Sequence, residues 1–135
     1  MALHESSVID CPFCEAFLAG SVLGASEFCF VVEDKYPSSP GHRLIVPKRH
    51  VADPFDLSEG ELLSMFELAR SSVVSLRLED PSVEGFNVGF NVAAVAGQTV
   101  EHAHLHVIPR RRCDVADPRG GIRWVIPATA VYWED

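Results

Sequence analysis

One long amphipathic segment, residues 57–80, constrains the fold of this 135-residue chain more than any other feature. Its apolar residues recur at three- and four-residue spacing, which predicts a helix with one buried stripe. Ser58 followed by Glu61 has the form of a capping box, and Asp80-Pro81 ends the helix. No other segment is long enough to connect parallel strands, so the accompanying sheet is expected to be mainly antiparallel. The predicted stripe consists of Leu62, Phe66, Ala69, Val73 and Leu76.

Short segments rich in branched and aromatic residues predict the strands of this sheet. They lie at residues 27–34, 43–47, 85–92 and 100–109. A shorter helix is predicted at about residues 13–19. Strands gathered around one long helix indicate an α+β fold, and the chain length suits a single domain.

Composition excludes several classes of protein. The formal charge is 11 − 19 = −8, which disfavours general binding to a nucleic-acid backbone. No apolar run approaches the roughly 18 residues of a membrane span. Residues 1–10 lack a basic start and an apolar stretch, so we expect no signal peptide and a cytoplasmic protein with reduced cysteines. The arginines and lysines near 43–49 and 110–123 are either solvated surface or a local field for a small anion.

Three histidines occupy alternate positions in the predicted strand 100–109. His102, His104 and His106 would therefore share one face, while the residues between them pack into the core. Packing alone explains them poorly, because each imidazole needs polar partners. They could bind a metal ion, or act as nucleophile and acid–base groups. The preceding segment, Ala-Gly-Gln-Thr at 96–99, offers N–H donors suited to phosphate oxygens, which favours attack of a histidine on phosphorus.

The stretch GQTVEHAHLHVIPR (97–110) resembles the signature of the histidine triad (HIT) family. Residues 34–50 resemble a second block of that family, with its Gly-His and Pro-Lys-x-His. Asn91 stands seven residues before Gln98, as in the family. The resemblance covers about residues 10–112. We therefore expect a HIT domain at 1–112 and a C-terminal extension at 113–135 packed on the same domain.

The resemblance implies a fold, an activity and partners. The fold would be a five-stranded antiparallel sheet with one long and one short helix, paired into a homodimer through one continuous sheet. The activity would be hydrolysis at the α-phosphate of purine nucleotide conjugates, either dinucleoside polyphosphates or nucleoside phosphoramidates. Neither nucleic acid nor membrane would be a partner. Two alternatives stay open, a dimeric nucleotide-binding scaffold with incidental turnover and a zinc-dependent hydrolase.

The resemblance also assigns roles to individual residues. His104 would attack phosphorus and form a nucleotidyl-imidazole that water hydrolyses. His106 would hydrogen-bond the phosphate, and Thr99 would assist the leaving group. Asp34 would accept hydrogen bonds from the ribose hydroxyls, or else only cap a turn. His42 would support the catalytic strand from behind. The nucleotide-binding set is Asp34, Asn91, Gly97, Gln98, Thr99 and His106.

The Cys-Pro-Phe-Cys sequence has three interpretations. It could be a redox pair, half of a zinc site, or two buried thiols. A redox pair usually follows a buried strand, and only polar residues precede Cys11. Some HIT proteins complete a zinc site with histidines at the positions of His50 and His102. The resemblance thus implies a structural Zn²⁺ bound by Cys11, Cys14, His50 and His102.

Overall fold

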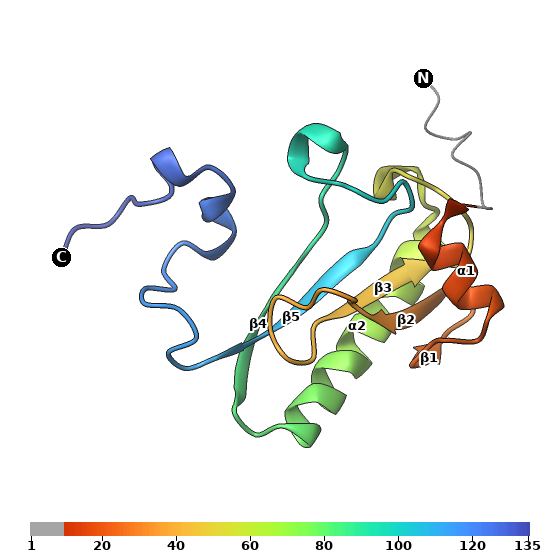
Figure 1. Ribbon diagram of the computed structural model, residues 1–135, viewed down its shortest axis with the longest axis horizontal. Helices are drawn as coiled ribbons and strands as arrows, with labels where there is room; N and C mark the ends of the chain where they lie inside the picture. The colour runs from red at the N-terminus through yellow and green to blue at the C-terminus, as the bar shows by residue number, and fades with distance from the viewer. Residues whose placement is uncertain (1–9) are drawn as a thin grey trace.

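A computed structural model of the chain describes residues 10–135. The expectation about a signal peptide rests on residues that, apart from Asp10, lie outside this range. A five-stranded antiparallel sheet in the order β1-β2-β3-β5-β4 forms the centre of the fold (Figure 1). The predicted α+β fold is confirmed. The elements are α1 (Pro12–Leu18), β1 (Gly24–Ala25), β2 (Cys29–Glu33), β3 (Arg43–Pro47), α2 (Glu59–Glu79), β4 (Val83–Gly89) and β5 (Leu105–Arg111).

The long helix α2 begins at the predicted capping box. The Ser58 hydroxyl accepts the backbone N–H of Glu61 at 3.1 Å, and the Glu61 carboxylate accepts that of Ser58 at 2.9 Å. The buried face runs through Met65, Ala69, Ser72 and Leu76. The prediction was wrong for Phe66, which is 53% exposed. Phe66 follows Met65 directly, and this step of one residue turns its side chain away from the sheet.

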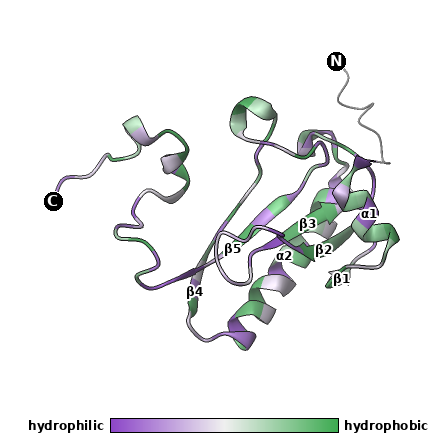
Figure 2. Ribbon diagram, viewed as in Figure 1, coloured by the Kyte–Doolittle hydropathy of each residue, from purple (hydrophilic) through white to green (hydrophobic). Residues whose placement is uncertain are grey.

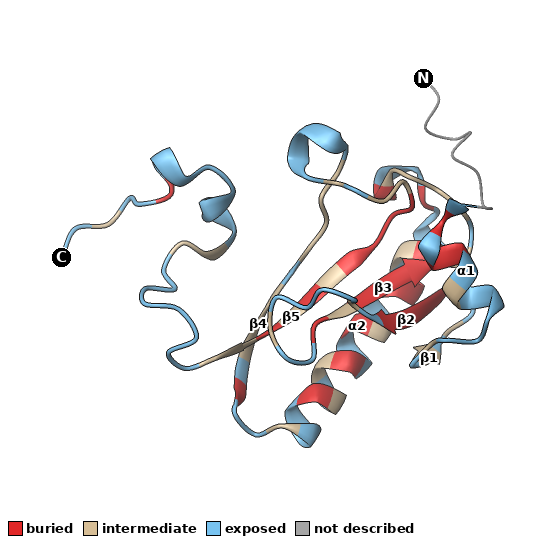
Figure 3. Ribbon diagram, in the orientation of Figure 1, coloured by how far each residue is buried: buried red, intermediate tan, exposed pale blue. Residues whose placement is uncertain are grey.

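Apolar side chains cover both faces of the central strands. Cys29, Val31 and Ile45 point toward α2, whereas Phe30 and Val46 point toward α1. Strands β2 and β3 are therefore apolar along most of their length and do not alternate with polar residues. Figure 2 shows this concentration of apolar residues, and Figure 3 shows that the same strands are buried.

The histidine segment enters the sheet later than its sequence pattern predicts. Strand β5 begins only at Leu105, so His102 and His104 precede it, and the predicted strand 100–109 was wrong in its first half. The β3–β5 ladder stops at the pair Ile45–Leu105. In the same register Pro47 would follow two pairs later, and it has no N–H to donate. The Pro47 carbonyl accepts from the His102 imidazole at 2.7 Å.

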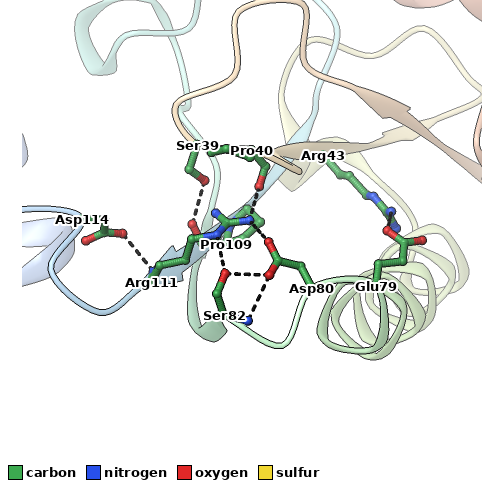
Figure 4. A network of polar contacts seen from close by, with 9 residues as sticks. All are labelled: Ser39, Pro40, Arg43, Glu79, Asp80, Ser82, Pro109, Arg111 and Asp114. Atoms are coloured by element: carbon green, nitrogen blue, oxygen red, sulfur yellow. Dashed lines mark hydrogen bonds and ion pairs between the residues drawn. The ribbon is translucent and has the colours of Figure 1, made fainter.

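A polar network holds the 35–42 loop against the end of β5 (Figure 4). The Arg111 guanidinium donates to the Pro40 carbonyl at 2.9 Å and to the Asp80 carboxylate at 2.8 Å. Ser82 and Arg111 hold the pKa of Asp80 down to about 2. The Ser39 hydroxyl donates to the Pro109 carbonyl at 2.7 Å. These contacts fix the loop that carries His42.

The C-terminal segment 113–135 leaves the sheet at the end of β5 and is largely exposed (Figure 3). Its start is tied to β5 by Asp114, which accepts two hydrogen bonds from Arg110, both at 2.7 Å. Farther along, Arg119 lies over the Trp133 ring at 4.7 Å. Within residues 10–135, none of the helices has the length and apolar character needed to cross a membrane.

Candidate active site and metal centre

Four potential metal ligands meet between α1, the end of β3 and the segment before β5. Cys11 caps the N-terminus of α1, and Cys14 lies in its first turn. The Cys14 Sγ lies 3.3 Å from Nδ1 of His50 and 3.6 Å from Nδ1 of His102, and those two nitrogens are 3.1 Å apart. All four donor atoms lie within 4.8 Å of one another.

The chemistry of this cluster suits zinc. The Nε2–H of His102 donates to the Pro47 carbonyl, which leaves the lone pair of Nδ1 directed at the two sulfurs. Burial lowers the pKa of His102 to about 4, so the imidazole is neutral, as a ligand must be. Burial, together with the neighbouring Cys11, raises the pKa of Cys14 to about 11. A bound cation would instead stabilise the thiolates. The residues present therefore fit a closed Cys2His2 zinc site.

His104 presents a lone pair to the adjoining pocket. Its Nδ1 lies 2.8 Å from the His102 carbonyl, which can only accept, so Nδ1 carries the hydrogen and Nε2 the lone pair. Burial lowers the pKa of His104. The imidazole is therefore neutral near pH 7 and can act as a nucleophile.

A chain of hydrogen bonds fixes the tautomer of His106. The backbone N–H of Ser38 donates to Nδ1 of His42 at 3.0 Å, so the hydrogen of His42 is on Nε2. That hydrogen points to Nδ1 of His106, 2.9 Å away, rather than to the Asp34 carboxylate at 3.5 Å. The remaining hydrogen of His106 is then on Nε2. This atom is buried and has no hydrogen-bond partner within residues 10–135, so a donor without an acceptor lies beside His104.

Burial, reinforced by His104 and His42, lowers the pKa of His106 to about 4. Burial likewise lowers the pKa of His42. His42, His104 and His106 are therefore neutral near pH 7, and in each ring one nitrogen can donate a hydrogen bond and the other can accept one.

The predicted nucleotide-binding residues come together around one cavity of about 640 Å³. Its wall is apolar where α1 and the central strands face it, through Phe13, Val32 and Leu44. The predicted residues that line it are Asp34, Asn91, Gly97, Thr99, His104 and His106.

The loop before the histidines is shaped by Gln98 and Gly97. The Gln98 amide donates to the carbonyls of Ala52 and Val100 and accepts the N–H of Ala93. In this arrangement the side chain of Gln98 holds the loop and does not reach the cavity. Gly97 has φ +98°, a left-handed conformation in which a side chain would be strained.

The sequence did not single out two residues of the site. The Phe13 ring lies 4.9 Å from that of His104 and 5.8 Å from that of His102, so it packs against both rings. Its place between the two cysteines was the only signal for this role. Ser38 acts through its backbone N–H, which no sequence pattern reveals.

Comparison with known proteins gives the chain's relatives. The HIT domain model matches residues 18–113. An AP-4-A phosphorylase of Mycobacterium tuberculosis is 34% identical over 67% of this chain and 47% of its own. A bis(5′-nucleosyl)-tetraphosphatase (asymmetrical) of Schizosaccharomyces pombe is 37% identical over 60% of this chain and 44% of its own. This chain thus spans less than half of either enzyme. The crystal structure of a Zn-bound histidine triad family protein from Mycobacterium smegmatis superposes with a TM-score of 0.72, at 30% identity and 82% coverage of both chains.

Proposed function

The chain belongs to the HIT family, and from this premise we propose that it is a nucleotide hydrolase that cleaves at the α-phosphate of purine nucleotide conjugates. Its substrates would be dinucleoside polyphosphates or nucleoside phosphoramidates. One observation carries the proposal. The lone pair of His104 Nε2 and the N–H of His106 Nε2, which has no hydrogen-bond partner among the described residues, belong to side chains that line the same cavity. A nucleophile beside a fixed donor suits attack on a phosphate.

The reaction would proceed in two displacements. In the first, His104 Nε2 forms a bond to phosphorus, the bond from phosphorus to the leaving group breaks, and the leaving atom takes up a proton beside Thr99. In the second, a water oxygen bonds to phosphorus and the N–P bond breaks. The proton released by water balances the one taken by the leaving group. The His102 carbonyl supports the positive charge on the His104 adduct, because it accepts from Nδ1.

The remaining contacts would be made by residues around the cavity. His106 and Asn91 would hold the phosphate oxygens, and Asp34 would accept from the ribose hydroxyls. The Asp34 carboxylate already accepts the N–H of Tyr36 at 2.8 Å through one oxygen, which leaves its second oxygen for a ligand. Gly97 and Gln98 would act by shaping the loop. The apolar wall would contact the base.

The metal cluster would bind one structural Zn²⁺ through Cys11, Cys14, His50 and His102. Zinc there would tie α1 to the segment that carries the nucleophile. With four protein ligands the site has no open position for water, so a zinc-dependent hydrolase is disfavoured. The Zn-bound M. smegmatis protein supports this assignment. Reduced cysteines also fit a cytoplasmic location.

A homodimer would form along β4. This strand is a seven-residue edge of the sheet, whereas β1 at the other edge has two residues. Long edges of this kind are paired or protected in native proteins. Val88 on β4 is exposed, as are Phe66 and Leu78 on α2. Two copies paired at β4 would form one continuous sheet.

The test compares AMP release from adenosine phosphoramidate and from diadenosine tetraphosphate, with His104→Asn as the control. We expect turnover of at least one substrate, and its loss in the variant by several orders of magnitude. Turnover that survives the substitution would refute the nucleophile. Tight AMP binding without turnover of either substrate would favour the dimeric scaffold instead.

A further inference from the structure

The backbone of Ala93, in the loop that joins β4 to β5 (teal in Figure 1), lies in a conformation that favours glycine. Its φ is +73° and its ψ is 160°. The left-handed region open to other residues has a ψ of roughly +30 to +60°, so Ala93 falls outside it, in a region that glycine alone adopts readily. In the part of the chain that the structure describes, only Cys113 shares a positive φ among residues other than glycine. The side chain at Ala93 therefore strains this loop.

Gln98 holds Ala93 in this conformation from two sides. The side-chain carbonyl of Gln98 accepts the Ala93 N–H at 2.9 Å, and the backbone N–H of Gln98 donates to the Ala93 carbonyl at 3.1 Å. The same side chain is anchored elsewhere, because its NH₂ group donates to the carbonyls of Ala52 at 2.8 Å and Val100 at 3.1 Å. Strain of this kind persists only where the surrounding contacts outweigh it. The contacts of Gln98 supply that restraint.

The strained residue stands between residues of the nucleotide cavity. Asn91 precedes it by two positions, and Gly97 and Thr99 follow it. These three residues line the cavity, whereas Ala93 does not. The Gly97 backbone lies against the Asn91 side chain, since a Cβ at Gly97 would be 3.9 Å from Cγ of Asn91. The turn at Ala93 therefore sets how Asn91 and Gly97 lie relative to each other.

We propose that Gln98 is a positioning residue for the phosphate contact and that it acts through the strained backbone of Ala93. The inference rests on the proposed function and adds to it the restraint that keeps Asn91 at the cavity. Without the Gln98 side chain, Ala93 relaxes to a negative φ, and Asn91 and Gly97 leave their places. One residue strained in this way changes an equilibrium constant by roughly 5- to 100-fold. The productive loop then becomes a minority state, and the affinity for nucleotide falls by the fraction that remains.

The experiment combines Gln98→Ala with Ala93→Gly and measures kcat/KM for AMP release from adenosine phosphoramidate and the Kd of AMP. Gln98→Ala should lower kcat/KM and raise Kd, each about tenfold. Ala93→Gly relieves the strain, so the single variant should stay near the wild type, and the double variant should recover most of the loss. Ala94→Gly is the matched control, because Ala94 is the next residue of the same exposed loop and has a negative φ.

Urea unfolding measures the strain without any ligand. Replacement of alanine by glycine ordinarily destabilises a protein, because glycine loses more conformational freedom on folding. We expect the opposite at this position, with a urea midpoint that rises in Ala93→Gly and falls in Ala94→Gly. A midpoint that falls in both variants overturns the strained restraint.

The remaining outcomes separate the role of Gln98 from the proposed hydrolase. A loss in Gln98→Ala that Ala93→Gly does not recover, or that Ala94→Gly recovers equally, overturns the positioning role. Wild-type kcat/KM and Kd in Gln98→Ala overturn it as well. If the wild type binds AMP but releases none from the phosphoramidate, the hydrolase is refuted, and the same recovery is still measured in Kd. If the wild type does not bind AMP, both are refuted.

Discussion

Replacing His42 tests the chain of hydrogen bonds from Ser38 through His42 to His106. In the wild type, His42 Nε2–H donates to Nδ1 of His106 at 2.9 Å and so keeps the other hydrogen of His106 on Nε2, the atom proposed to donate to the phosphate. His42→Leu removes this donor. His42→Gln is the matched control, because its amide can donate to His106 and accept from Ser38.

The expected loss follows from the burial of the pair. His42 is buried, so water does not replace the missing donor. A buried acceptor left unpaired costs about 1–3 kcal/mol. If His106 relieves this cost by moving its hydrogen to Nδ1, the phosphate loses its donor. Either way, kcat/KM should fall about 10- to 100-fold in His42→Leu.

Two measurements check this account. The first is kcat/KM for AMP release in both variants, where His42→Gln should stay within a few-fold of the wild type. The second is ¹⁵N NMR of His106, which should show a protonated Nε2 in the wild type and a mixture of tautomers in His42→Leu. A His42→Leu enzyme with wild-type kcat/KM and an unchanged His106 tautomer would refute the reasoning.

Three further predictions concern the metal, the pH dependence and the backbone. Purified protein should carry about one zinc per chain, and His50→Ala should lose zinc and stability together; metal analysis below about 0.2 zinc per chain without chelator would contradict the site. The pKa of His106 is lowered from 6.5 to about 4. As the pH falls, the unfolded chain therefore binds a proton at His106 before the folded chain does. The free energy of unfolding that His106 contributes above pH 6.5 should be lost as the pH falls toward about 4. The free energy of unfolding, measured with urea, should fall less steeply with decreasing pH in His106→Gln than in the wild type. An equal slope in both proteins would contradict the lowered pKa of His106. Gly41 has φ +94°, and a Cβ there would lie 2.8 Å from Cδ2 of Leu76. Gly41→Ala should lower the free energy of unfolding by about 2–4 kcal/mol, whereas Gly85→Ala, with open space around it, should cost at most about 1 kcal/mol.

Local signals in the sequence predicted local structure well. The capping box at Ser58 and the strand 43–47 appear as expected, because each depends on neighbouring residues and on the limits that proline imposes. Phe66 was misplaced because two adjacent apolar residues, Met65 and Phe66, compete for the buried face, and the packing of the whole helix on the sheet decides between them.

The histidine segment shows where local reasoning fails. Alternation predicted a strand through His102, but the neighbouring strand ends at Pro47, and this partner is far away in the sequence. The bonds from His102 to Pro47 and from Gln98 to Ala52 are equally long-range. A cavity of about 910 Å³ beside β4 is lined in part by the segment 113–135, which lies outside the matched domain and carries no signal for it in the sequence.

The geometry gives the three histidines different roles. His102 belongs to the metal cluster, His104 offers a lone pair, and His106 offers a hydrogen. Phe13 packs against the rings of both His102 and His104. Carbonyls, which can only accept, fix the tautomers of His102 and His104. His42 fixes that of His106, and the Ser38 N–H fixes that of His42. The three histidines of one short segment therefore differ because each has a different hydrogen-bond partner.

Detection of the nucleotidyl-histidine itself tests the proposed mechanism most directly. The protein would be mixed with adenosine phosphoramidate, quenched within the first turnover at alkaline pH, and analysed by peptide mass spectrometry. We expect one added AMP group on the peptide that contains His104 and no adduct in His104→Asn. Rapid AMP release with no adduct on that peptide, or an adduct that persists in His104→Asn, would contradict it.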